Sequence, residues 1–328
     1  MYRVDSSQEL QVSFFSNQTL ELIVLPTEQC NFRCTYCYEK FIGRFLSKES
    51  VDSIKMLISK RAPELSQLRI GWFGGEPLLA KEIVYEISNH ALQEAKRYKN
   101  LLFESGMSTN GYLLDLETAK RLIEYGVNEF QISLDGPSEI HNKTRVKKDG
   151  TGTFDKIYSN LLELKNSSLL FKINIRIHMS KEASSYLDAF VASVSEEFSN
   201  DDRFRIFLKT IDQLGGDNDE DIGIITGDEK VELEHRLSNI VKKNNVELIN
   251  PGSSYICYAA RPTSFVIRHN GNLVKCTIGL DDEENQIGKL TDDGKLEIYQ
   301  HKMRPWLEGA VKLDRGKLQC PRRTLSSL

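Results

Sequence analysis

The most informative stretch of the chain is Cys30-Asn-Phe-Arg-Cys34-Thr-Tyr-Cys37, with the spacing C-x3-C-x2-C and an aromatic residue, Tyr36, before the third cysteine. Three thiolates this close in sequence can converge from one loop on a soft metal centre. They are one ligand short of the four in a closed zinc site or a four-cysteine iron–sulfur cluster. An iron that lacks a protein ligand can bind a small molecule, so the spacing predicts a reactive site.

The cysteine stretch follows the first of six apolar or β-branched runs that alternate with helical patterns. Strands alternating with helices predict parallel pairing through right-handed crossovers, and six units predict an open, partial TIM-type (β/α)6 barrel. The segment 115–126 is typical, because an N-capping Asp precedes apolar residues at helical spacing and a glycine ends the pattern. The expected strands are 20–25, 68–73, 101–107, 129–134, 172–179 and 203–211, and the expected helices lie near 47–61, 80–97, 115–126, 154–165 and 183–197.

Each unusual motif comes directly after one of these strands. After the cysteine stretch these are Gly74-Gly75-Glu76-Pro77, then Ser108-Thr-Asn110-Gly, then Ser133-Leu-Asp135-Gly. In α/β barrels the chemistry is found at the carboxyl ends of the strands, so the motifs are predicted to share one site. Asn-Gly and Asp-Gly are also ordinary turn formers, which is the structural alternative for the last two motifs.

The strand–helix alternation ends at an acidic, glycine-containing loop, 214–221. A helix is expected near 227–244, and a β-rich tail begins at Pro251 with a hairpin pattern around Asn270-Gly271. We therefore expect a lead-in at 1–19, the barrel at 20–215, a linker and helix at 216–250, and a small α+β domain at 251–328.

Composition gives no reason to expect nucleic-acid or membrane partners. The 43 Lys and Arg residues against 47 Asp and Glu give a net charge of −4, and the N-terminus lacks the pattern of a secretory signal. A cytoplasmic location is the expectation. Six cysteines in such a chain favour metal or catalytic chemistry over disulfides, and Cys257, Cys276 and Cys320 predict a second cluster far from the first in sequence.

The cysteine stretch combined with Gly74-Gly75-Glu76-Pro77 resembles the radical S-adenosylmethionine (SAM) enzymes over about residues 18–212. In that family three thiolates hold a [4Fe–4S] cluster, and its fourth iron chelates SAM through the amino and carboxylate groups. The reduced cluster cleaves SAM to a 5′-deoxyadenosyl radical. The resemblance implies that Cys30, Cys34 and Cys37 are the cluster ligands.

The resemblance also assigns residues to SAM itself. The Gly-Gly-Glu motif is expected to receive the amino group, and Tyr36 to lie against the adenine. Polar groups after the third and fourth strands suit the ribose hydroxyls and the methionine carboxylate, for which Arg145 is the expected bidentate partner. The expected SAM-binding residues are Tyr36, Gly74, Gly75, Glu76, Ser108, Asn110, Ser133, Asp135 and Arg145.

Cys257-x13-Gly271-x4-Cys276 resembles the opening of the SPASM or shorter twitch extension of many peptide-modifying radical SAM enzymes. A full SPASM domain continues with a C-x2-C-x5-C-x3-C run, whereas here only Cys320 follows. The resemblance implies one auxiliary cluster, expected to be [4Fe–4S], with a non-cysteine fourth ligand or an open iron. A zinc site, or cysteines that are simply small buried hydrophobes, are the alternatives. His178 and His269 lie on strand patterns and could line the cavity.

SPASM and twitch enzymes act mostly on ribosomally made peptides and on protein side chains. Sulfatase maturases carry an Asp after the Gly-x4-Cys cysteine, whereas this chain has Thr277, so formylglycine synthesis is disfavoured. We expect a maturase that installs a side-chain crosslink, a cyclophane or thioether, in a precursor peptide. The alternatives are modification of a protein side chain or a small amino-acid derivative, and an iron–sulfur scaffold or redox sensor without turnover. The Gly-Gly-Glu-Pro motif argues against a sensor.

The expected partners follow from this reaction. They are the precursor peptide and an electron donor such as flavodoxin or ferredoxin. Only about 18 residues precede the first expected strand, so a fused winged-helix leader-binding domain is not expected. Leader recognition would then come from a separate leader-binding protein or from the barrel.

Overall fold

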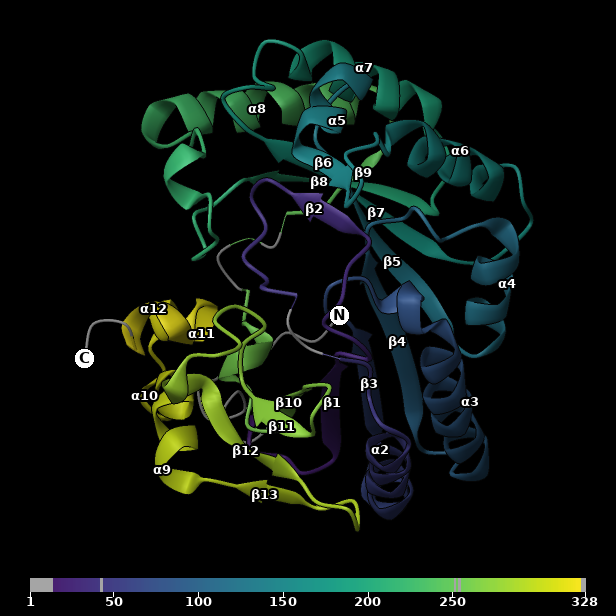
Figure 1. Cartoon of the computed structure of the whole chain (residues 1–328), viewed down its shortest axis with the longest axis vertical. Helices are drawn as coiled ribbons and strands as arrows, with labels where there is room; N and C mark the ends of the chain where they lie inside the picture. The colour runs from purple at the N-terminus through teal and green to yellow at the C-terminus, as the bar shows by residue number, and fades with distance from the viewer. Residues whose placement is uncertain (1–13, 42–43, 251, 253–254, 326–328) are drawn as a thin grey trace.

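The computed structural model describes residues 14–41, 44–250, 252 and 255–325. All six expected barrel strands are present and pair in parallel in the order of the chain. Together they form a curved, open sheet (Figure 1), which confirms the partial α/β barrel. The strands are β1 (Thr19–Val24), β3 (Gln67–Trp72), β4 (Leu102–Thr109), β5 (Val127–Leu134), β7 (Lys172–Met179) and β8 (Phe204–Thr210).

Helices connect these strands and lie along the outer side of the sheet (Figure 1). The expected N-cap of one of them is confirmed, since the Asp115 side chain accepts a hydrogen bond from the Thr118 backbone N–H at 2.8 Å. No helix in the described part of the chain is long and apolar enough to cross a membrane. The barrel helices are α2 (Lys48–Arg61), α3 (Lys81–Arg97), α4 (Leu116–Glu124), α5 (Ser138–Thr144), α6 (Phe154–Lys165), α7 (Leu187–Glu197) and α8 (Gly227–Lys243).

Alternation along the strands separates the core from the barrel interior. In β7, Ile173, Ile175 and Ile177 are buried in the layer shared with the helices. Arg176 and His178, which alternate with these isoleucines, line a cavity on the inner side of the sheet. A strand whose two faces meet different surroundings is expected to alternate in this way. The barrel interior is therefore polar where the helix-facing layer is aliphatic.

A two-stranded sheet inside the barrel was not predicted. Its strands, β2 (Phe32–Cys34) and β6 (Arg145–Lys147), pair antiparallel, with Cys34 opposite Arg145. β2 lies within the cysteine stretch itself, so this pairing fixes that stretch against the segment that follows β5. Phe32 at its start is 1% exposed and anchors the loop in the core.

The C-terminal residues extend the barrel sheet and do not form a sheet of their own. The outermost barrel strand β1 pairs in parallel with β10 (Ser264–Ile267), which starts the expected hairpin. An antiparallel ribbon continues from it, and in Figure 1 this ribbon lies beside β1, with the short C-terminal helices around it. The remaining elements here are β11 (Asn272–Val274), β12 (Gln286–Leu290), β13 (Leu296–Ile298), α9 (Gln300–Met303), α10 (Glu308–Lys312), α11 (Arg315–Gln319) and α12 (Pro321–Leu325).

The segment expected to be a linker and helix also takes part in the barrel. α8 packs beside α7 and buries Leu233, Leu237 and Val241, while β9 (Glu247–Leu248) pairs in parallel with β8. The described strands thus form one sheet in the order β13-β12-β11-β10-β1-β3-β4-β5-β7-β8-β9, apart from β2 and β6. Single-turn 3-10 helices are η1 (Ala62–Glu64), η2 (Pro77–Ala80), η3 (Asp219–Asp221), η4 (Tyr258–Ala260), η5 (Glu283–Asn285) and η6 (Arg304–Leu307).

Candidate functional site

The three clustered cysteines face a cavity of about 680 Å³ at the carboxyl ends of the barrel strands. Cys34 is held by the β2–β6 pairing, and Asn31 beside Cys30 accepts a backbone hydrogen bond from Lys148 at 3.0 Å. The Cys37 backbone N–H donates to the Cys34 carbonyl at 3.1 Å, which closes a tight turn. The loop therefore presents its thiols from a fixed backbone, as a metal-binding loop must.

The electrostatics of these thiols suit a cationic ligand. Burial raises the pKa of Cys30, and the Glu76 carboxylate and the thiols of Cys34 and Cys37 raise it further. Burial, together with the Glu39 carboxylate, raises the pKa of Cys37 to about 12. Thiols in such surroundings become thiolates when a metal supplies positive charge, because a coordinating thiol is deprotonated outright. Three soft donors on one buried loop fit an iron–sulfur cluster.

The glycines of Gly74-Gly75-Glu76-Pro77 are required by the backbone of the cysteine loop. A Cβ on Gly74, whose φ is +117°, would lie 2.2 Å from the Thr27 carbonyl oxygen. A Cβ on Gly75 would lie 2.3 Å from the carbonyl oxygen of Gln29. Both glycines also line the cavity. The motif thus lets two backbone segments touch at the edge of the site, in addition to leaving room for a ligand.

Glu76 differs from its expected placement. Its side chain is fully buried and is not among the residues that line the cavity. One carboxylate oxygen accepts hydrogen bonds from Leu78 N–H at 2.9 Å and the Thr109 hydroxyl at 2.8 Å, and the other accepts from Asn110 N–H at 2.7 Å. The carboxylate therefore ties the Gly-Gly-Glu-Pro turn to the end of β4, and three of its roughly four acceptor positions are used by the protein itself.

A buried polar network lies beneath the cavity around Tyr36. The Tyr36 hydroxyl donates to Asp135 at 3.0 Å and accepts from Arg145 at 2.8 Å. His178 Nδ1 lies 2.9 Å from the same Asp135 oxygen, and the Thr144 hydroxyl donates to the other oxygen at 2.6 Å. Although burial opposes ionisation, His178 and Arg145 lower the pKa of Asp135, so it is a carboxylate. Tyr36, Asp135 and Arg145 were each expected to contact SAM, and the structure joins them in one network with His178, which the sequence placed only on a strand that could line the cavity.

The other expected SAM residues lie on the cavity wall. Ser108 and Asn110 line it from the end of β4, and Ser133 lines it from β5. The Asn110 amide donates to the Asn31 side chain at 2.8 Å and reaches the Cys30 sulfur at 4.0 Å. Asn110 is therefore linked to the cysteine loop as well as facing the cavity.

The second cysteine trio opens on the same cavity, because Cys276 and Cys320 also line it. Cys257 belongs to the same group. Burial raises its pKa, and the Cys320 thiol raises it further. Burial, together with the Cys257 thiol, raises the pKa of Cys276 to about 11. The Cys257 N–H donates to the Leu318 carbonyl at 2.9 Å, which brings α11 and Cys320 to it. Cys257 directly precedes η4, Cys276 lies just after β11, and Cys320 directly follows α11.

Asn285 fixes the position of Cys276. Its side-chain oxygen accepts from the N–H groups of Lys275 and Cys276 at 2.9 Å, and its amide donates to the Cys276 carbonyl at 2.8 Å. Thr277, where a sulfatase maturase would carry an Asp, is 2.9 Å from the Tyr258 hydroxyl. Within the described ranges, no three His, Cys, Asp or Glu side chains lie close enough to hold a single metal ion.

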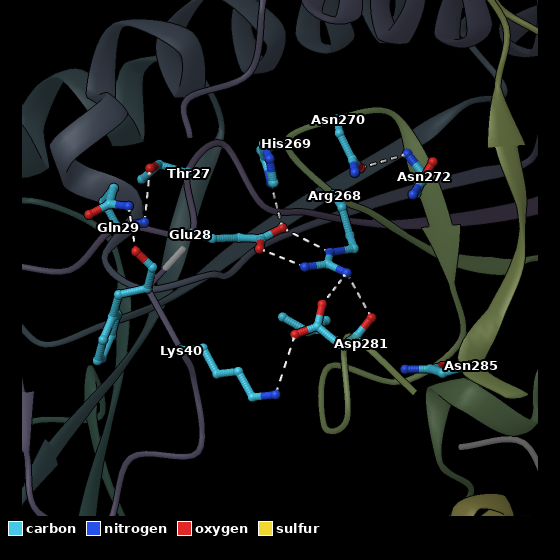
Figure 2. Close-up of polar contacts among 12 residues, drawn as sticks. Thr27, Glu28, Gln29, Lys40, Arg268, His269, Asn270, Asn272, Asp281 and Asn285 are labelled. Atoms are coloured by element: carbon cyan, nitrogen blue, oxygen red, sulfur yellow. Dashed lines mark hydrogen bonds and ion pairs between the residues drawn. The ribbon is translucent and has the colours of Figure 1, made fainter. Parts of the chain in front are cut away.

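A buried ion-pair network joins the two cysteine regions, and sequence reasoning missed it (Figure 2). Glu28, just before Cys30, receives two hydrogen bonds from Arg268 at 2.9 and 2.8 Å and one from His269 at 2.8 Å. Arg268 also binds Asp281 at 2.9 Å, and Lys40 approaches the other oxygen of Asp281 at 3.9 Å. The hairpin that carries Cys276 is thus clamped onto the loop that carries the first trio.

The protein is thus an open α/β barrel that carries a three-cysteine loop at the carboxyl ends of its strands. A family profile described as the Radical SAM superfamily matches residues 24–179. This segment of the chain is a radical SAM domain, which confirms the family resemblance.

Known proteins similar to this chain belong to the same group. The cysteine-type anaerobic sulfatase-maturating enzyme of Clostridium perfringens is 29% identical over 208 residues, which cover 60% of this chain and 53% of that enzyme. The chain therefore matches about half the length of this relative.

Two solved structures share the fold. The structure of anSMEcpe with bound AdoMet and Kp18Cys peptide has a TM-score of 0.69 at 20% identity, covering 92% of this chain and 88% of that one. Streptococcus suis SuiB bound to precursor peptide SuiA has a TM-score of 0.58 at 16% identity, covering 92% and 69%. At these identities the likeness concerns the fold.

Proposed function

We propose that this chain is a radical SAM maturase that acts on a precursor peptide and installs a side-chain crosslink, a cyclophane or thioether. The observation that carries the proposal is that one cavity of about 680 Å³ is bordered by all three cysteines of the first trio and by Cys276 and Cys320 of the second. A cavity of this size suits SAM together with part of a peptide. When bound, a reduced [4Fe–4S] cluster supplies the electron that cleaves SAM to a 5′-deoxyadenosyl radical.

The residues of the chain have separate tasks in this proposal. Cys30, Cys34 and Cys37 ligate the cluster. The backbone of Gly74 and Gly75, which borders the cavity, receives the SAM amino group, while the buried Glu76 holds that turn in place.

Arg145 is proposed to bind the SAM carboxylate together with Ser133. Its guanidinium uses one nitrogen on Tyr36, and its buried Nε has no hydrogen-bond partner among the described residues. An anionic ligand would complete it. Asp135 acts indirectly, because its carboxylate orients Tyr36 and His178 and is not itself part of the cavity wall.

Ser108, Asn110 and the ring of Tyr36 are proposed to contact the nucleoside part of SAM. Each of these residues borders the cavity. The Tyr36 hydroxyl is engaged by Asp135, Arg145 and His178, so its ring is the part offered to an adenine. An aromatic face of this kind suits a purine.

The second trio is proposed to hold one auxiliary cluster in a domain that begins near residue 251. Cys257, Cys276 and Cys320 supply three thiolates, and the fourth position is left to another ligand or to the substrate. The six described cysteines are free thiols, which suits a reducing cytoplasm.

A peptide substrate is supported by the peptides bound in two structures that share the fold. anSMEcpe was solved with the Kp18Cys peptide and SuiB with precursor peptide SuiA. A separate leader-binding protein and an electron donor such as flavodoxin or ferredoxin complete the proposed set of partners.

The second candidate is modification of a protein side chain, favoured by the similarity to a sulfatase-maturating enzyme. Thr277 argues against it, because its hydroxyl is hydrogen-bonded to Tyr258 and offers no carboxylate base. A sulfatase-derived cysteine peptide separates the two candidates: conversion to formylglycine would favour the second.

The test begins with reconstituted protein, SAM and a chemical reductant. We expect 5′-deoxyadenosine to form, together with tight equilibrium binding of SAM. Absence of both would overturn the radical SAM activity and favour an iron–sulfur protein without turnover. Mass spectrometry of a precursor peptide encoded nearby, after co-expression, then tests the crosslink through a loss of two hydrogen masses.

A further inference from the structure

Arg176 of β7 is a cation of the cavity wall that the tasks above do not use. Its guanidinium faces the cavity, and its buried Nε has no hydrogen-bond partner in the described part of the chain. Its described contact is a cation–π interaction with the ring of Phe207, 5.8 Å from the centroid. Burial lowers the pKa of Arg176, but an arginine still remains charged at neutral pH.

Three of the other cations of this wall have partners, and a fourth, Arg323, is exposed to solvent. Lys209 forms an ion pair with Asp212 at 2.6 Å, and Arg322 forms one with Asp282 at 2.9 Å. Arg145 donates to Tyr36. Desolvating a charge without a partner is costly, so the partly buried guanidinium of Arg176, which has no described carboxylate partner, marks a place that an anion is expected to complete.

The position of Arg176 puts this anion beside the proposed SAM site. Arg176 pairs in register with Ser133 on β5 and with Phe207 on β8. Neighbouring strands lie about 4.8 Å apart, so a group bound to Arg176 would lie next to the ligand of Ser133. The Phe207 ring, whose centroid is 5.8 Å from the guanidinium carbon of Arg176, limits the orientations of this group.

We propose, on the basis of the function above, that Arg176 binds a carboxylate of the peptide substrate and so selects an acidic residue or a free C-terminus near the modified position. The planar fork of arginine matches a carboxylate through two parallel hydrogen bonds. SAM has its own proposed partners, Arg145 and Ser133. The carboxylate on Arg176 therefore belongs to the peptide and fixes which of its residues reaches the radical.

Binding of four capped tripeptides to the reconstituted, SAM-loaded chain tests the proposal by ligand-observed NMR. Ac-Ala-Glu-Ala-NH2 is compared with Ac-Ala-Gln-Ala-NH2, and Ac-Ala-Ala-Ala-OH with its C-terminal amide, so that the two sources of a carboxylate are separated. We expect at least one acidic peptide to bind about tenfold more tightly than its neutral partner, as for a charge-assisted bidentate contact. Equal affinities within both pairs, including no binding of any peptide, would overturn the proposal.

Variants identify the residue responsible. Arg176→Leu is expected to lose the preference for the acidic peptide. Arg176→Lys is expected to keep part of it, because lysine keeps the positive charge but lacks the two parallel N–H donors of the guanidinium. Arg205→Gln is the matched control, since Arg205 lies on the neighbouring strand and is already paired with Glu129. A preference that survives in folded Arg176→Leu overturns the proposal, with thermal unfolding as the check on folding.

A separate measurement distinguishes SAM from the peptide as the anion. Equilibrium dialysis of SAM is expected to give the same affinity for wild type and Arg176→Leu. A tenfold loss of SAM affinity would assign the anion to SAM and overturn the proposal. Formation of 5′-deoxyadenosine by wild type without peptide tests the radical SAM activity independently, so failure of the activity and failure of the carboxylate site are told apart.

Discussion

The two cysteine trios both contribute to the wall of one cavity, the second through Cys276 and Cys320, but they are built in different ways. Cys30, Cys34 and Cys37 come from one loop whose backbone is fixed by β2–β6 pairing and by the close approach of Gly74 and Gly75. Cys257, Cys276 and Cys320 come from three segments that meet through hydrogen bonds of Leu318 and Asn285. The first site is organised by local chain geometry, whereas the second depends on tertiary packing.

This difference explains why the two trios differ as sequence signals. A loop that supplies all its ligands must keep their spacing, and the spacing is then readable. A site assembled from separate segments tolerates any chain length between them. The ion-pair network of Glu28 and Arg268 couples the two, so the second trio takes its position from the first loop.

Loss of a ligand from each trio should give the largest contrast. Cys34→Ala is expected to reduce 5′-deoxyadenosine formation below detection, because the first cluster loses one of its three protein ligands. Cys276→Ala is expected to keep SAM cleavage without peptide and to lose peptide product. Iron analysis should show loss of roughly half the iron in either variant. SAM cleavage that is abolished equally in both would contradict separate roles.

The second contrast concerns the ion-pair network. Arg268→Met leaves the Glu28 carboxylate buried without its main partner, and breaking such a pair costs about 3–5 kcal/mol of unfolding free energy. Arg236→Met is the matched control, since Arg236 pairs with Asp188 at 2.9 Å on the exposed surface, where a pair contributes about 0–1 kcal/mol. Urea denaturation of the metal-free proteins measures both. Equal costs would show that the network does not clamp the two regions.

The third contrast compares two glycines. Gly75→Ala places a Cβ 2.3 Å from the Gln29 carbonyl oxygen, and overpacking of this kind costs about 1–3 kcal/mol. Gly316→Ala in α11 meets only the Asp314 side chain at 3.4 Å and is expected to be neutral or to stabilise by up to about 1 kcal/mol. Thermal unfolding of both variants checks the order. A more stable Gly75→Ala would refute the close approach of the two loops.

The smallest effect concerns two asparagines. Asn110→Ala removes an amide that reaches the Cys30 sulfur, so the first cluster is expected to become harder to reduce, by on the order of tens of millivolts. Asn285→Ala removes a hydrogen-bond partner of Cys276, in the second trio, and is expected to leave the reduction potential of the first cluster unchanged. Redox titration followed by EPR provides the measurement. A change in the reduction potential of the first cluster in Asn285→Ala but not in Asn110→Ala would contradict the placement of Asn110 beside that cluster.

The barrel was predictable because its signals are local. The helix 154–165 and the strand 172–179 have the expected bounds, since periodic burial of apolar residues marks each of them. β2 and β6 were missed because each has only three residues, and their pairing joins distant segments. The short helices after residue 300 carry too few turns to give a periodic pattern.

In the candidate site, residues in contiguous motifs could be predicted and long-range partners could not. Glu28 and Arg268 are 240 residues apart, and neither has a local signal. Arg176 and His178 do have a local signal. In Lys-Ile-Asn-Ile-Arg-Ile-His-Met, polar residues alternate with isoleucine, which marks the inward face of a strand. Glu76 was assigned to a ligand because sequence does not reveal that Leu78, Thr109 and Asn110 already occupy its carboxylate.

The pairing of β1 with β10 has a consequence for how the chain folds. β1 is among the first strands to be synthesised, yet one of its edges stays unpaired until Ser264–Ile267 has been made. An apolar strand with a free edge is a template for aggregation, and pairing over such a sequence separation is slow. We therefore expect fragments that end before β10 to be prone to aggregate.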